Sequence, residues 1–231
     1  SRSEDIFGYQ QVPHVVKLGA QQLIGQERTA FERIENILGN SAPRITEFAD
    51  LRGRGGLKYR YAAMGNGAST TFQKAYAKGA ALEEIERYLR IVFDEQLGRF
   101  YRAAILERAN LLEHYRFEPK FGPSVRASVE AVLGSPALDK KLSLMGGHEC
   151  PNPCFFYERD LAEILPLATG SSYFSYVHGD LNGANIIIDA QDNIWLIDFF
   201  HTGRGHVLKD LIKLENDLLY IFTQINSEVE F

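Results

Sequence analysis

The sequence predicts an α+β fold in two parts, a small β-rich unit over residues 1–66 and a larger, mainly helical unit over residues 67–231. Three observations support this division. Strand-like runs surround one helical run in the first part, the segment GNGAS (65–69) is typical of a linker, and from Thr70 to about Tyr115 apolar residues recur at helical spacing. The chain of 231 residues, 45% apolar and 24% charged, can form a sizeable core.

The first part is expected to contain a strand, a helix and a hairpin. Residues 12–18 (VPHVVKL) have strand composition, and a helical pattern follows over 21–38, closed by Gly39. Residues 44–51 and 57–64 resemble two further strands. The RGRGG segment between them favours a hairpin turn over a phosphate-binding loop, because no helix follows its glycines.

The second part is less regular. Breaks such as PKFGPS, GSPALD and GGHECPNPC interrupt residues 118–160, and residues 159–167 fit a helix or a strand. Residues 185–189 (NIIID) and 193–198 (NIWLID) form a predicted hairpin around the turn at 190–192. Apolar residues at helical intervals over 207–224 predict a final helix.

Composition restricts the expected partners and location. Net charge is −5 and the pI is about 5.7, with no basic stripe, which disfavours nucleic acid and anionic membranes as partners. No apolar run approaches the roughly 20 residues of a spanning helix, and SRSEDIFGYQ lacks signal-peptide features. We therefore expect a cytoplasmic location. There, Cys150 and Cys154 are expected to be plain thiols rather than a disulfide or a metal knuckle with His148.

A polar cluster precedes the predicted hairpin of residues 185–198. In YVHGDLNGANIIID (176–189), His178, Asp180 and Asn185 stand between apolar runs, where polar groups must be paired or used. The second strand of the hairpin ends at Asp198. Hard cations such as Mg²⁺ take oxygen ligands, which Asn185 and Asp198 can supply. Asp180 is then left to accept the proton of a substrate hydroxyl.

The loop and the strand end together carry a family resemblance. The pattern H-G-D-x-x-x-x-N over 178–185, followed by Ile197-Asp198-Phe199, resembles the catalytic core of the aminoglycoside phosphotransferase and choline kinase branch of the protein-kinase-like fold. The resemblance implies a bilobal fold, a catalytic Asp180, and metal binding by Asn185 and Asp198. Phe200 occupies the place of the glycine in the Asp-Phe-Gly motif of protein kinases.

Two further segments extend the resemblance. GRGHVLKDLIKLE (203–215) is similar to the family segment in which an aspartate at a helix start, here Asp210, supports the catalytic loop through its backbone. VVKLG (15–19) is similar to the strand with the phosphate-binding lysine, here Lys17. The helix after it would then carry a glutamate that pairs with this lysine.

Helical geometry selects that glutamate. Glu27 falls on one face with apolar residues at spacings of three or four, while Glu32 and Glu35 point away; the apolar residues of this face are Leu23, Phe31, Ile34 and Leu38. A carboxylate in an apolar stripe is costly unless it is paired, so an ion pair with Lys17 would explain Glu27. The alternative is that Glu27 lies at the solvated edge of the stripe.

The remaining polar residues of the region are assigned lesser roles. We group His178 with Asp180 in the catalytic loop and expect it to orient the loop rather than to react. His201 and His206 could suggest a two-metal hydrolase, but the upstream sequence offers no further ligand motifs for one. Asn182 could contact the loop or only solvent.

The resemblance implies an enzyme that moves the γ-phosphate of ATP to a hydroxyl of an unknown acceptor, with Lys17 on the phosphates, Glu27 holding Lys17, and Mg²⁺ on Asn185 and Asp198. The alternative is a catalytically silent kinase-like module that binds other domains of a larger protein. Only 16 residues, with Gly8 as the one glycine, precede Lys17, too few for the phosphate-covering hairpin of the family. Nucleotidyl transfer on the same fold is a third reading.

Overall fold

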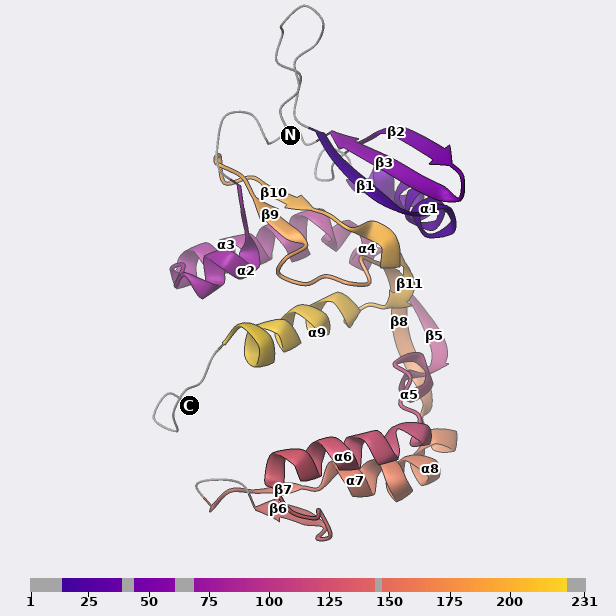
Figure 1. Cartoon of the computed structure of the whole chain (residues 1–231), viewed down its shortest axis with the longest axis vertical. Helices are drawn as coiled ribbons and strands as arrows, with labels where there is room; N and C mark the ends of the chain where they lie inside the picture. Colours follow the sequence, from indigo (N-terminus) through magenta and orange to yellow (C-terminus); the bar gives the residue numbers. More distant parts are fainter. Residues whose placement is uncertain (1–13, 39–43, 61–68, 144–146, 224–231) are drawn as a thin grey trace, which may run out of the picture. The chain divides into compact units, whose positions relative to one another are not determined.

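The computed structural model describes residues 14–38, 44–60, 69–143 and 147–223. The chain divides into two compact units. The first combines Ser1–Ile105 with Phe174–Gln224, and the second comprises Leu106–Tyr173 with Ile225–Phe231. The predicted boundary near residue 66 lies outside the described residues. Figure 1 shows the elements of both units in sequence colours.

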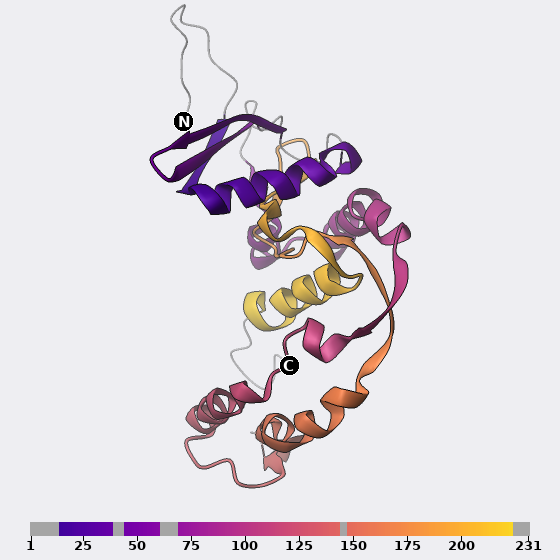
Figure 2. The same cartoon turned by 90° about the vertical axis from the view of Figure 1, so that its right-hand side faces the viewer.

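The first unit opens with a three-stranded antiparallel sheet and a helix. The sheet has the order β1-β3-β2, from β1 (His14–Ala20), β2 (Arg44–Leu51) and β3 (Arg54–Arg60). The helix α1 (Gln21–Leu38) follows β1 directly and lies along one face of the sheet (Figure 2). Ile24 of α1 packs there with Leu57 of β3, and both are buried.

The hairpin between β2 and β3 is tighter than predicted. Leu51 pairs with Arg54, so the turn consists of Arg52 and Gly53, with φ of 48° and 76°. Two consecutive positive φ values are typical of a type I′ turn, whose twist suits a two-residue hairpin loop. The glycines at 55 and 56 thus belong to β3, and a Cβ at Gly55 would fall 2.8 Å from Cβ of Ile24. Glycine therefore lets α1 approach the sheet closely.

The rest of the first unit surrounds a second core. A short sheet has the order β10-β9-β4, from β4 (Thr70–Thr71), β9 (Ile186–Ile188) and β10 (Ile194–Leu196). The helices around this core are, in chain order, α2 (Phe72–Ala77), α3 (Leu82–Arg90) with its π-helical continuation η2 (Ile91–Gln96), α4 (Gly98–Arg102), the 3₁₀ turn η7 (Phe199–His201), and α9 (Lys209–Asn216) with its π-helical continuation η8 (Asp217–Phe222). The buried side chains of this core include Phe72, Val92, Leu181, Leu196 and Leu214.

The second unit is mainly helical. It begins within β5 (Ile105–Asn110) and contains α5 (Leu111–His114), η3 (Pro119–Phe121), α6 (Gly122–Leu133), β6 (Lys141–Ser143), β7 (Glu149–Pro151), α7 (Pro153–Phe155), η5 (Phe156–Asp160), α8 (Leu161–Ile164) and η6 (Leu165–Leu167). Residues 159–167, which fitted either a helix or a strand, are thus helical. Cys150 and Cys154 are free thiols, with Cys154 buried beside Leu142.

The chain returns to the first unit through β8 (Thr169–Val177), which pairs antiparallel with β11 (Gly203–His206). The sequence did not predict β8, because its first half, TGSS, lacks strand composition. Over the described residues, no helix has both the length and the apolar character needed to cross a membrane.

Candidate active site

Lys17 joins two carboxylates that come from distant parts of the sequence. Its Nζ lies 2.8 Å from Oε2 of Glu27 on α1 and 3.0 Å from Oδ1 of Asp198 after β10. Glu27 is 2% exposed, whereas the side chain of Asp198 is 42% exposed. Partial burial tends to lower the pKa of Lys17, but the two carboxylates outweigh it and raise that pKa above its ordinary value.

Glu27 owes its position to the helical stripe, although the stripe differs from the predicted one. Ile24 and Phe31, which are 3% and 2% exposed, flank Glu27 on the buried face of α1. Leu23, assigned to that face, is 50% exposed, so its placement was wrong. Residues three or four apart can both share one face of a helix, so spacing alone allows either Leu23 or Ile24 on the face of Glu27. The contact of Ile24 with the sheet places Ile24 on the buried face. The side chains of Ile34 and Leu38 lie outside the described residues.

Tyr59 completes the surroundings of Glu27 and was not predicted from the sequence. Its hydroxyl on β3 donates a 2.6 Å hydrogen bond to Oε1 of Glu27, while Lys17 contacts Oε2. Both oxygens of the buried carboxylate therefore have a partner, as burial of a charge requires. Tyr59 pairs with Val15 of the lysine strand in the sheet register, a relationship that no local pattern in the sequence marks.

Asp210 connects helix α9 to the HGD loop. Its Oδ2 and Oδ1 each accept a 2.8 Å hydrogen bond, from the backbone N–H of His178 and of Gly179 respectively. Tyr101 on α4 donates a third bond to Oδ2, at 2.9 Å. Asp210 is fully buried, and burial followed by the charge of Asp210 raises the pKa of Tyr101, which keeps its hydroxyl protonated as a donor. Tyr101 was also missed from sequence.

Gly179 allows the loop to turn beneath the residues that follow Asp198. Its φ is +88°, and a Cβ there would lie 2.1 Å from the carbonyl oxygen of His201. Only glycine combines this backbone conformation with such a close approach. This geometry therefore requires glycine at position 179.

His178 is a buried ring with a fixed orientation. It is 1% exposed, its Nε2 lies 2.9 Å from the carbonyl oxygen of Ile197, and its ring contacts Phe199. Its Nδ1 has no hydrogen-bond partner among the described residues, which suits a neutral ring that donates from Nε2. Burial lowers the pKa of His178 and outweighs the raising effect of three nearby carboxylates, Asp210, Asp180 and Asp198. A ring so buried offers no surface for direct contact with a substrate.

Asn182 and Asn185 shape the second half of the loop. The side-chain oxygen of Asn182 accepts bonds from the backbone N–H groups of Ala184 and Asn185, at 3.0 and 3.2 Å. Asn185 donates from Nδ2 to the carbonyl oxygen of Asp180, at 2.9 Å. Asn182 thus contacts the loop rather than only solvent. Within the described part of the chain, the carboxylate of Asp180, half-buried in this loop, forms no side-chain hydrogen bond or ion pair.

Asp198 is held at the strand end in a left-handed backbone conformation, with φ 63° and ψ 68°. Aspartate tolerates this region better than most residues, and such conformations are concentrated at functional sites. The preceding residue, Ile197, donates its N–H to the carbonyl oxygen of Asn185, at 3.0 Å. The backbone positions of the two predicted metal ligands are therefore linked across the hairpin.

The buried Asp189 stabilises the same hairpin. It accepts hydrogen bonds from the backbone N–H of Gln191, from Asn193, and from the indole N–H of Trp195. Burial alone would raise the pKa of Asp189, but these donors lower it below its ordinary value. Asp189 is thus an ionised structural residue of the hairpin that carries Asn185 and Asp198 at its ends.

The two other histidines near Asp198 do not form a metal cluster with it. His201 is exposed and contacts Phe200, whereas His206 is buried against Phe174. Over residues 14–38, 44–60, 69–143 and 147–223, no three His, Cys, Asp or Glu side chains are grouped as metal ligands. A two-metal hydrolase therefore has no support in the described residues.

The oxygen donors of the site nevertheless suit one kind of metal. Mg²⁺ is commonly held by one or two protein oxygen ligands together with substrate phosphates, and does not need a cluster of three protein ligands. Asn185 offers a side-chain oxygen that accepts no hydrogen bond from the described residues, and Asp198 offers an exposed carboxylate. These donors fit magnesium bound along with a phosphate ligand.

The fold of the chain is similar to that of a solved aminoglycoside phosphotransferase, which confirms the predicted fold class. The aminoglycoside phosphotransferase APH(3'')-Id of Streptomyces rimosus, solved with ADP and streptomycin, matches over 98% of this chain and 78% of its own, with a TM-score of 0.50 and 15% identity. The choline kinase LicA of Streptococcus pneumoniae matches over 94% and 64%, with a TM-score of 0.46 and 16% identity.

The chain belongs to the family described as Ternary complex associated domain 9. The sequence profile of this family matches residues 1–138 and 130–231, which together span the chain. No curated protein has significant sequence similarity to this chain.

Proposed function

We propose that the chain is a phosphotransferase that moves the γ-phosphate of ATP to a hydroxyl of an acceptor. The observation that carries this proposal is the meeting of Lys17, Glu27 and Asp198 at distances of 2.8 and 3.0 Å, from three separate segments. A cation fixed by a buried carboxylate next to an exposed carboxylate is suited to bind a nucleotide phosphate together with a metal. The fold shared with phosphotransferases supports the same reading.

Each residue of the site has a role in this proposal. Lys17 binds the nucleotide phosphates, and Glu27 with Tyr59 holds the ammonium group in place. Asp180 hydrogen-bonds the acceptor hydroxyl and takes its proton as the new bond to phosphorus forms and ADP leaves. Asp210 and Tyr101 are positioning residues that fix the loop carrying Asp180.

A magnesium ion held by Asn185 and Asp198 would supply positive charge to the phosphate oxygens. The chain itself contributes the orientation of these ligands. The Asn182 side chain fixes the backbone at Asn185, and the left-handed backbone at Asp198 sets the direction of its carboxylate.

The second candidate function is a catalytically silent module that serves as a binding or regulatory domain. One observation favours it: the ammonium of Lys17 already neutralises Asp198, the carboxylate that a metal would need. In a silent module this ion pair would be permanent, whereas in an enzyme it must exchange for metal and nucleotide. Binding of ATP and turnover therefore separate the two functions.

Turnover of the Asp180→Asn variant tests the proposal. We would measure ADP release from ATP and Mg²⁺ with a panel of hydroxyl acceptors that includes aminoglycosides, choline and serine-containing peptides. General-base catalysis contributes roughly 10²–10⁴-fold, so D180N should lose at least about 100-fold in rate and still bind ATP. Asp139→Asn, at an exposed position of the second unit, is the matched control.

Two results would count against the enzyme. Turnover that survives in D180N at the rate of the wild type would remove Asp180 from the chemistry. A wild-type chain that binds ATP and releases no ADP with any acceptor, or with water, would favour the silent module.

A further inference from the structure

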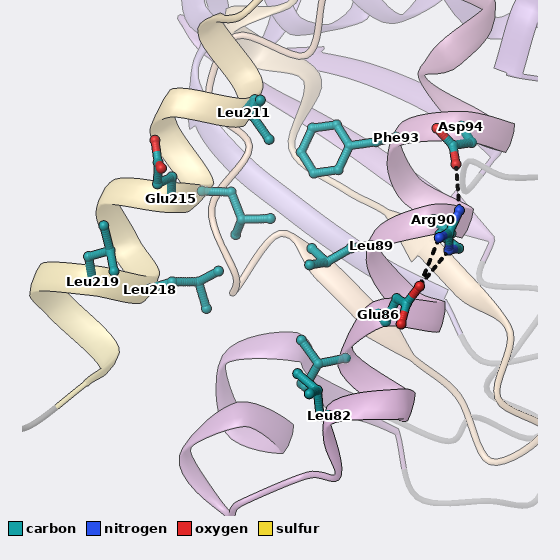
Figure 3. A pocket seen from close by; sticks show the side chains of 12 residues that line it. Leu82, Glu86, Leu89, Arg90, Phe93, Asp94, Leu211, Glu215, Leu218 and Leu219 are labelled. Carbon is teal, nitrogen blue, oxygen red and sulfur yellow. Dashed lines mark hydrogen bonds and ion pairs between the residues drawn. The ribbon is translucent and has the colours of Figure 1, made fainter.

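An apolar groove lies on the first unit, between two helical segments, and none of the residues that line it belongs to the proposed site. One wall is α3 with η2, and the other is α9 with η8; the groove has a volume of about 650 Å³. Figure 3 shows Leu89 and Phe93 on one wall directed toward Leu211 and Leu218 on the other. Its floor includes Leu214, which is 1% exposed.

The groove leaves large apolar side chains in contact with solvent. Leu82 is 76% exposed and Leu211 is 48% exposed, and both line it. Single exposed leucines are ordinary, but exposed leucines that line one concave surface are typical of a binding site for another polypeptide.

The spacing of the apolar side chains indicates the shape of the occupant. Leu82 and Leu89 are seven residues apart on one wall, and so are Leu211 and Leu218 on the other. Residues seven apart are almost in line along a helix, so each wall presents a stripe parallel to its own axis. Two adjacent helices with such stripes form a groove in which the side chains of a third helix can interdigitate with theirs.

The charges at the rim indicate the polar residues of the occupant. Glu86, Asp94 and Glu215 border the groove, with Arg90 as the one basic residue among the groove-lining residues described. Arg90 is already engaged, at 2.8 Å from Glu86 and 3.9 Å from Asp94 (Figure 3). Carboxylates therefore exceed cations at the rim, and lysine or arginine beside the apolar face of a partner would complement them.

We propose that this groove binds an amphipathic helix whose apolar face is flanked by lysine and arginine. The wall formed by α3 and η2 runs continuously from Leu82 to Gln96, which corresponds to about four helical turns. The groove thus accommodates a helix of similar length. This binding surface does not depend on the proposed phosphotransferase activity, because none of its residues belongs to the site of Lys17, Asp180 and Asp198.

The probe is a synthetic 15-residue amphipathic helix with leucine at heptad spacing and lysine on both flanks. Its counterparts are the same helix with glutamate flanks and a scrambled lysine peptide of identical composition that is not amphipathic. Fluorescence anisotropy with the full chain should show binding of the lysine helix alone, weakening as salt rises. Scrambling controls for attraction to the net negative chain.

Variants locate the binding on the chain. Leu82→Glu and Leu211→Glu should each weaken binding of the lysine helix about tenfold, as loss of an apolar contact and a buried charge imply. Leu167→Glu, at a position 82% exposed in the second unit, should leave binding unchanged. Glu215→Lys should weaken the lysine helix and strengthen the glutamate helix. Circular dichroism confirms that each variant is folded.

Several outcomes would overturn the proposal. Equal binding of the helical and the scrambled lysine peptides would show simple charge attraction. Binding unaffected by L82E and L211E would place it elsewhere. Light scattering tests for a dimer of the chain. If the chain is a dimer and both L82E and L211E dissociate it, the occupant of the groove is a second copy and not a basic helix.

Discussion

Lys17 and Asp198 are 181 positions apart in the sequence, yet Nζ of the first lies 3.0 Å from Oδ1 of the second. The same ammonium lies 2.8 Å from the buried Glu27. Lys17 therefore links a fixed carboxylate with an exposed one. Under the proposed function, binding of metal and nucleotide must release Asp198 from Lys17, while Glu27 remains paired with Lys17.

The first prediction concerns the stability contributed by Lys17. Lys17→Met leaves Glu27 buried without a cation, although Tyr59 still donates to it. We expect a loss of about 1–3 kcal/mol in the free energy of unfolding, measured with urea. Lys58→Met removes a pair with the exposed Glu47 and should cost less than about 1 kcal/mol. Equal losses would show that the Lys17 pair is an ordinary surface pair.

The second prediction concerns Tyr101. Tyr101→Phe removes one of the three donors to the buried Asp210 and should lower the free energy of unfolding by about 1–2 kcal/mol. If Asp210 positions the catalytic loop, the variant should also turn over more slowly while its affinity for ATP is unchanged. Tyr220→Phe, at a position 78% exposed, is the control. A variant as stable and active as that control would contradict the role of Tyr101.

The third prediction compares two glycines with positive φ. Gly179→Ala places a Cβ 2.1 Å from the carbonyl oxygen of His201, whereas Gly134→Ala meets nothing within 4 Å. Both variants incur the left-handed penalty of about 1–2 kcal/mol, and only the first adds a backbone clash. Thermal unfolding should therefore show a clearly larger loss for G179A. Similar losses would mean that the loop at Gly179 moves freely to accommodate a side chain.

The fourth prediction is a pH dependence of stability that comes from His178. Burial holds its pKa below the ordinary 6.5 in the folded chain, so the unfolded chain binds the proton first as pH falls. The contribution of His178 to the free energy of unfolding is fully present above pH 6.5. It decreases as the pH falls below 6.5 toward the pKa of His178 in the folded chain. His206, whose pKa burial also lowers, adds to the same trend.

The measurement for this prediction is urea unfolding at pH 7.5 and pH 5.5. His178→Gln should reduce the difference in free energy between the two pH values, and His148→Gln, at an exposed position, should leave it as in the wild type. A difference that His178→Gln does not reduce would show that His178 is not the titrating group.

The order of the main elements could be read from the sequence because the segments have strong periodicity. The bounds of α1 match the predicted helix at 21–38, and a helix over 209–222 lies within the predicted 207–224. The predicted hairpin turn, residues 52–56, was longer than the observed turn at Arg52 and Gly53, since the choice among several adjacent glycines depends on the contact of Gly55 with Ile24. Strand β8 was missed, because its pairing with β11 outweighs weak local preference.

Some residues of the candidate site could likewise be found from the sequence, and others could not. The family resemblance was enough to single out Lys17 and Asp198, whose contact the structure shows. The partners Tyr59 and Tyr101 could not be found, because a tyrosine hydroxyl that serves a buried carboxylate carries no local pattern. Only the packing of β3 on α1, and of α4 near α9, brings these hydroxyls to Glu27 and Asp210.

Calorimetric titration with ATP, with and without Mg²⁺, tests the central claim most directly, on the wild-type chain and on Asp198→Ala. The proposed site predicts magnesium-dependent binding of ATP that is lost in D198A and kept in the control Asp139→Ala. Absence of binding to the wild-type chain, or ATP binding that is the same without Mg²⁺ and in D198A, would contradict a nucleotide site built on Lys17 and Asp198.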